Sequence, residues 1–159
     1  MPIISTKYQI NIRLVLTIRL ISGLVWFGTV IRRLGSNYGN FEERIATMSE
    51  GTTIFPELFM NLAVDNWFII YLIVITLEIL SSISLLTGTL ARAGALFSTL
   101  NGFGIGMAGL GLGLIDLIIP WSVALLTLVL FLFTHPGRFK GVDSILHEKN
   151  LPRILQIWT

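Results

Sequence analysis

The chain has no cysteine and only two histidines among its 159 residues. Without thiols it cannot form disulfide bonds, ligate an iron–sulfur cluster or carry out thiol redox chemistry. The histidines, His135 and His147, both lie near the C-terminus and form a poor basis for a haem or a metal site. We therefore expect no haem and no metal ligand, and no self-contained redox centre.

Charged residues are also scarce. They make up 13% of the chain, whereas hydrophobic residues make up 53%; soluble domains carry about 25% charged residues. The mean hydropathy of +0.80 agrees with this. Lipid must therefore solvate most of the surface, and we expect an integral membrane protein. A net charge of +2, with the basic residues near helix ends, argues against nucleic acid as a partner.

A helix needs about 20 apolar residues to cross a bilayer. Four apolar stretches have about this length, at residues 12–31, 67–87, 93–114 and 117–134. The sequence therefore predicts an all-α fold, a single membrane domain built as a four-helix bundle. The first stretch does not fit a cleaved signal peptide, because it is long, contains Arg19 and has no small-residue cleavage site after it.

The long polar segment 32–66 separates the first two stretches and contains a possible short helix near Phe41 to Ser49. Seven Lys and Arg residues lie on the side of the termini and three on the side of this segment, with Arg19 left out because it lies within a span. Cytoplasmic loops carry the excess of basic residues. We therefore predict a multi-pass protein of the cell membrane, with both termini cytoplasmic and segment 32–66 outside.

Two ionisable residues, Arg19 and Glu78, lie well inside the predicted spans. Each costs roughly 2.5–3.5 kcal/mol at a helix centre, so each needs a partner. Counted from the cytoplasmic ends, Arg19, Asn101 and Glu78 lie about 10–14 Å deep. We predict an Arg19–Glu78 ion pair with Asn101 in the same layer. The alternative is that these residues only hold the helices together.

The helix faces around this layer carry aromatic and polar side chains. Trp26 shares a face with Arg19, and Tyr71 shares one with Glu78. A few polar donors in an apolar lining suit a flat head group with carbonyl oxygens, such as a quinone. Glu78 and Arg19 are thus the candidate catalytic residues, and Trp26, Tyr71 and Asn101 the candidate ligand-binding residues. Anchoring at the membrane interface is the alternative role for the aromatic residues.

Small residues recur along one stripe of the third stretch and predict close approach of another helix. The stripe includes Gly102, Gly106, Gly109 and Gly113. Its partner is either within this chain or in another membrane subunit. The repeated Gly-x-Gly is not a nucleotide fingerprint, because no strand–helix–strand unit surrounds it.

Three motifs carry a resemblance to a known family: RLISGLVWFGTVIRR (19–33), EILSSISLLTGTLARAGAL (78–96) and THPGRFKGVDSIL (134–146). In their order and spacing the chain resembles the DoxX superfamily, and within it the DoxD-like small subunit of thiosulfate:quinone oxidoreductase. The resemblance implies a respiratory subunit that helps to pass electrons from thiosulfate to membrane quinone, with other membrane subunits and lipid as partners. A non-catalytic accessory subunit of a terminal quinol oxidase or respiratory supercomplex is the alternative. A small transporter is a weaker one, since no repeat is visible.

Overall fold

A computed structural model describes residues 12–35, 39–51, 62–108, 114–134 and 141–142. Nearly all of these residues are helical, and no strand occurs among them. The main helices are α1 (Ile12–Gly35), α2 (Gly39–Gly51), α4 (Trp67–Thr87), α5 (Ala91–Ala108) and α6 (Leu114–Phe133). The predicted all-α class is confirmed for the described part of the chain.

The helix bounds agree with the predicted stretches in part. The bounds of α4 match, and α2 confirms the short helix predicted near Phe41 to Ser49. Helix α1 continues four residues beyond residue 31, where basic side chains in its last turn favour the negative end of the helix dipole. The predicted boundary at residue 114 is wrong, because Leu114 opens α6.

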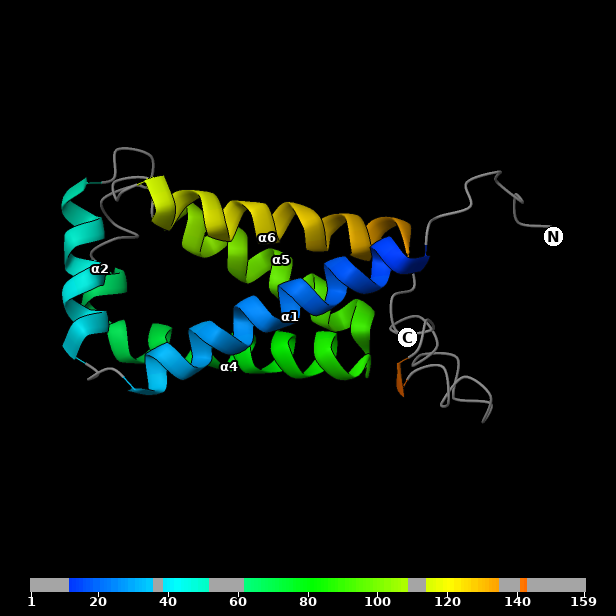
Figure 1. The fold of residues 1–159 in the computed structure, drawn as a ribbon. Coiled ribbons are helices and arrows are strands. Elements are labelled where there is room, and N and C mark those ends of the chain that lie inside the picture. The colour runs from blue at the N-terminus through cyan, green and yellow to red at the C-terminus, as the bar shows by residue number, and fades with distance from the viewer. Residues whose placement is uncertain (1–11, 36–38, 52–61, 109–113, 135–140, 143–159) are drawn as a thin grey trace, which may run out of the picture.

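The four long described helices lie side by side, and α2 lies across one end of them (Figure 1). Helix α4 packs between α1 and α5, α5 packs on α6, and α6 also contacts α1. Helix α2 packs on α4. We call the end next to α2 the α2 end, and the opposite end, where α4 turns into α5, the Gly88 end.

Glycines set the closest approaches between helices. A Cβ atom at Gly102 would lie 2.9 Å from the carbonyl oxygen of Pro120 and 3.0 Å from the Cβ of Ala124, and one at Gly106 would lie 2.8 Å from the Trp121 ring. These two glycines of the predicted stripe therefore already face α6 of the same chain. Contact of the stripe with another subunit stays a prediction. Gly109 and Gly113 lie outside the described residues.

The interior between the described helices contains many polar side chains beside its apolar core, and many large apolar side chains are exposed on the outer surface. The buried polar residues are Arg19, Ser22, Glu78, Ser81, Ser82, Ser98, Thr99, Asn101, Thr127 and Thr134. Leucine, isoleucine and phenylalanine side chains are exposed along α1, α4 and α6.

Two described helices, α1 and α4, are long and apolar enough to cross a membrane, judged by length and composition. In each, only 33% of the most apolar window is buried. A core helix of a soluble protein would instead be mostly covered.

Candidate functional site

Glu78 lies in the middle of α4, and its side chain is fully buried. The Nε of Arg33 donates hydrogen bonds to both carboxylate oxygens, at 2.9 and 3.0 Å. Arg33 stands in the last turn of α1, and side chains of a helix point back toward its N-terminus. The guanidinium is therefore directed from the helix end toward the buried carboxylate. The Arg33 side chain is only 16% exposed.

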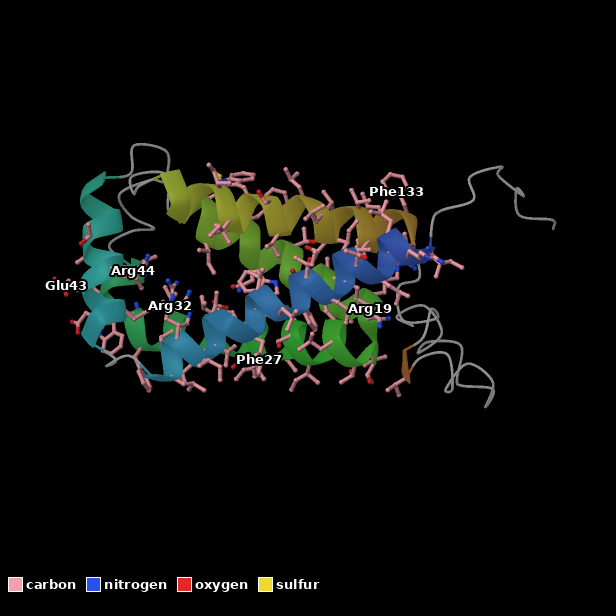
Figure 2. All side chains as sticks on the ribbon, viewed as in Figure 1. Arg19, Phe27, Arg32, Glu43, Arg44 and Phe133 are labelled. Carbon is pink, nitrogen blue, oxygen red and sulfur yellow. The ribbon has the colours of Figure 1, made fainter. Side chains whose placement is uncertain are left out.

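The predicted Arg19–Glu78 ion pair is wrong. Arg19 lies at the Gly88 end, where its Nη1 would be 2.9 Å from a Cβ atom placed on Gly88 (Figure 2). The error has a physical cause: Gly23 packs on Leu85 and Leu86, so α1 is displaced along α4 by about three turns from the predicted register. Equal depths counted from the two helix ends do not correspond to equal positions in the assembled helices.

Asn101 does lie at about the level of Glu78, as predicted. Gly94 of α5 packs against Ser84 of α4, and these antiparallel helices are joined by a short connection. Seven residues further along α5 is Asn101, and seven residues back along α4 is Leu77, beside Glu78. The amide nitrogen of Asn101 is buried and makes no hydrogen bond to any described residue. It is thus a donor available to a ligand.

Trp26 links α1 to α5. Its indole Nε1 donates a hydrogen bond of 2.5 Å to the hydroxyl of Ser98, and both side chains are buried. The indole N–H is therefore already used within the chain, and Trp26 offers a ligand only its ring. Trp26 is buried on the same face of α1 as Arg19, as its spacing predicts, whereas its role in binding a ligand stays a prediction.

Tyr71 lies toward the α2 end, on the same buried face of α4 as Glu78. The ring of Phe41 on α2 meets it edge-on, with ring centroids 5.2 Å apart. The guanidinium carbon of Arg33 lies 5.3 Å from the centroid of the same Phe41 ring, within the range of a cation–π contact. Phe41 thus joins Arg33 and Tyr71, and helix α2 covers this side of the ion pair.

Arg33 and Phe41 were not among the predicted site residues. Arg33 was assigned to the outer loop, because a basic residue at the end of an apolar run is typical of a helix flank. The backward direction of helical side chains is the signal that identifies it, once α1 is extended to residue 35. No pattern in the sequence pairs Phe41 with Tyr71, because α2 is oriented only by tertiary packing.

The Gly88 end is built mainly by close packing of backbone. Gly88 adopts the left-handed conformation, with φ of 72°, and its N–H bonds to the carbonyl of Ser84 to end α4. A Cβ atom at Gly88 would lie 2.7 Å from the Cα of Gly141. Nearby, Arg92 Nε donates to the carbonyl of Phe131, at 3.1 Å, and its guanidinium lies over the Phe131 ring.

The site therefore combines a buried ion pair, a buried amide donor and two aromatic side chains. The structure places Glu78 and Asn101 at one level, Trp26 and Tyr71 on either side of them along the helices, and Arg19 at the far end. Such a set can bind a carbonyl oxygen and hold a proton on a carboxyl group. In the described ranges, no three His, Cys, Asp or Glu side chains lie together as metal ligands do.

Comparison with known proteins gives no match for this chain, whether among protein families, curated proteins or solved structures.

Proposed function

We propose that this chain is a multi-pass membrane subunit of a thiosulfate:quinone oxidoreductase, and that it binds the quinone head group beside Glu78. The resemblance to the DoxX superfamily supplies the reaction class. The observation that carries the site is the buried Arg33–Glu78 pair at the level of the Asn101 amide, inside helices with apolar outer faces.

Membrane insertion through α1, α4, α5 and α6 accounts for this distribution. Exposed leucine and isoleucine side chains are favourable against lipid, and charged side chains then belong in the interior. The excess of basic residues on the side of the termini places the Gly88 end toward the cytoplasm and the α2 end outside. Helix α6 (Leu114–Phe133) is the fourth apolar helix of the proposed membrane bundle, beside α1, α4 and α5.

The overall reaction sets the roles of the side chains. Two thiosulfate ions give up two electrons and form tetrathionate, and the quinone takes up those electrons with two protons to form the quinol. In this proposal Asn101 Nδ2 donates a hydrogen bond to one quinone carbonyl oxygen, and the Glu78 carboxyl group delivers a proton to the head group. Arg33 holds the carboxylate in place between protonations. Arg19, at the other end, has no part in this site.

The test is thiosulfate-dependent quinone reduction in membranes that contain the assembled complex. Because Glu78→Gln keeps the shape of the side chain but removes the ionisable group, we expect the rate to fall about a hundredfold. The matched control is Asp65→Asn, which neutralises an exposed acid of the same chain. Full activity of Glu78→Gln with intact assembly would remove Glu78 from the reaction and favour the accessory-subunit alternative.

A second measurement separates ligand binding from folding. Asn101→Leu removes the amide donor while keeping a side chain of similar size. We expect less quinone to co-purify with this variant, with an unchanged amount of assembled protein. Equal quinone content in Asn101→Leu and the natural chain would contradict the proposed position of the head group.

A further inference from the structure

Three buried polar atoms, one from each of three packed helices, have no hydrogen-bond partner in the described part of the chain. They are Ser22 Oγ on α1, Ser81 Oγ on α4 and Asn101 Nδ2 on α5. Both serines are 0% exposed and Asn101 is 4% exposed. A buried polar group left without a partner destabilises the folded protein, so three such groups in one core call for a common explanation.

The three atoms follow one another along the helix axes. Ser22 precedes Gly23, which packs on Leu85 and Leu86, so it lies near the Gly88 end of α4. Ser81 lies about 8 Å further toward the α2 end, and Asn101 about another 6 Å further, at 1.5 Å of rise per residue. Along the helix axes, each of these intervals is long enough for one or two water molecules, given an oxygen–oxygen distance of about 2.8 Å.

Charged side chains stand at both ends of this row. Arg19, three residues before Ser22 on α1, lies beside Gly88. Glu78, three residues before Ser81 on α4, lies at the level of Asn101. Residues at i and i+3 of a helix are neighbours on one face. Polar groups therefore recur at intervals of about one to one and a half turns from the Gly88 end to the buried carboxylate.

We propose that this row, which we call the polar column (Ser22, Ser81 and Asn101), binds a file of water molecules that connects Glu78 with the Gly88 end. Buried water typically makes about three hydrogen bonds to groups of this kind. The amide nitrogen of Asn101 carries two N–H groups, so one can bind water while the other binds a ligand.

The inference rests on the proposed function and deepens it. Reduction of a quinone by two electrons from thiosulfate consumes two protons, and the carboxyl group of Glu78 must be reprotonated after each transfer. Apolar side chains surround the long helices, and α2 with Phe41 covers the α2 end. Through the polar column, protons reach Glu78 from the Gly88 end, which is the cytoplasmic side in the proposed orientation.

The lack of native cysteine allows a direct test of the water. Ser22→Cys and Ser81→Cys each place a single thiol in the polar column, and Ala95→Cys places one in the apolar core at a similar depth, where Ala95 is fully buried. A thiol in water ionises more readily, and one unit of pKa changes the thiolate fraction about tenfold. We therefore expect Ag⁺ to react with Cys at positions 22 and 81 at least about tenfold faster than at 95. Equal rates would overturn the proposal.

A second measurement uses the unsubstituted chain, so it does not depend on how cysteine packs. Hydroxyl radicals produced by X-ray pulses label side chains next to bound water, even when these are buried. We expect labelling of Trp26, which is buried beside Ser98, and its loss by more than half in Ser81→Val. Trp121, which packs on Phe103 and Gly106 away from the polar column, is the internal control: its labelling should be the same in Ser81→Val as in the natural chain. A natural chain in which Trp26 stays unlabelled would contradict a hydrated core.

Proton delivery to Glu78 is tested through the rate of quinone reduction and its solvent isotope effect. In assembled membranes we expect Ser81→Val to slow quinone reduction several-fold and to raise the solvent isotope effect, with an unchanged KM for quinone. The control is Ser122→Val, at an exposed position of α6. If the column is hydrated but Ser81→Val retains the full rate and isotope effect, protons take another route and this part of the proposal is wrong.

The two proposals fail separately. Reaction of the column thiols with Ag⁺ and labelling of Trp26 require neither quinone nor partner subunits. A hydrated column together with a fully active Glu78→Gln variant would therefore remove the quinone site and leave the water file in place.

Discussion

Each end of the helices contains an arginine, buried in the case of Arg19 and partly buried in the case of Arg33, and the two are held in different ways. At the α2 end, Arg33 is paired with a carboxylate and covered by an aromatic ring. At the Gly88 end, Arg19 lies against a tight turn where two glycine backbones approach each other. The α2 end is thus distinguished by an ion pair beneath an aromatic ring, and the Gly88 end by the close approach of two backbones. Added volume should therefore act mainly at the Gly88 end.

The comparison also shows how position in sequence can mislead. Arg33 looks like a flanking residue because it ends an apolar run, yet its side chain reaches the buried Glu78. Arg19 looks like an intramembrane residue because it lies within such a run, yet it stands beside the turn that follows α4. Helices of unequal length pack with a stagger, and this stagger decides which side chains meet.

The largest effect is expected from breaking the ion pair. Arg33→Leu leaves the Glu78 carboxylate buried without its cation, which destabilises a folded protein by about 3–5 kcal/mol. The measurement is the free energy of unfolding of the purified protein in detergent micelles. Arg32→Leu, at the exposed neighbouring residue, should change it by less than about 1 kcal/mol. The double variant Arg33→Leu/Glu78→Leu should recover most of the loss, and a double variant as unstable as Arg33→Leu would contradict this account.

The next largest change in the free energy of unfolding is expected from adding side-chain volume at the Gly88 end. Gly88→Ala forces a side chain into the left-handed region, at a cost of about 1–2 kcal/mol, and brings its Cβ against Gly141. We expect a fall of about 2–3 kcal/mol in the free energy of unfolding. The control is Gly28→Ala, where the added Cβ meets nothing and alanine favours the helix. If both alanine variants behave alike, close packing does not organise this end.

The hydrogen bond between Trp26 and Ser98 lies between the two ends and should show an intermediate effect. Trp26→Phe leaves the buried Ser98 hydroxyl without its donor, and we expect a loss of about 1–2 kcal/mol. A double-mutant cycle with Ser98→Ala measures the coupling. Additive losses in the cycle would mean that the bond contributes little and that Trp26 acts through its volume alone.

The smallest effect is expected at Phe41, which covers the ion pair. Phe41→Leu keeps an apolar side chain but removes the edge-on contact with Tyr71 and the cation–π contact with Arg33, for a loss of about 0.5–1.5 kcal/mol. Phe27→Leu, at an exposed position of α1, is the matched control. Equal midpoints of thermal unfolding in the two variants would show that α2 does not stabilise the α2 end.

Hydropathy predicted α1 and α4 as helices long and apolar enough to cross a membrane, because a crossing requires about 20 apolar residues whatever the partner helix is. The spacing of residues along one helix also predicted its buried faces: Tyr71, Ile75, Glu78 and Ser82 are all buried. Both predictions depend on the geometry of a single helix. The level shared by Asn101 and Glu78 was predictable because only a short connection separates α4 from α5 and fixes their register.

By itself, the amino-acid sequence determined the all-α class, the bounds of α4 and which residues face the interior, since these follow from helix periodicity and apolar length. Only the tertiary structure decided the partner of Glu78, because that choice depends on the stagger between α1 and α4, and the stagger is set by the contact of Gly23 with Leu85 and Leu86. It also decided that Gly102 and Gly106 face α6 of the same chain. Local periodicity fixes which face of a helix is buried, whereas the fit of side chains across two helices fixes what that face meets.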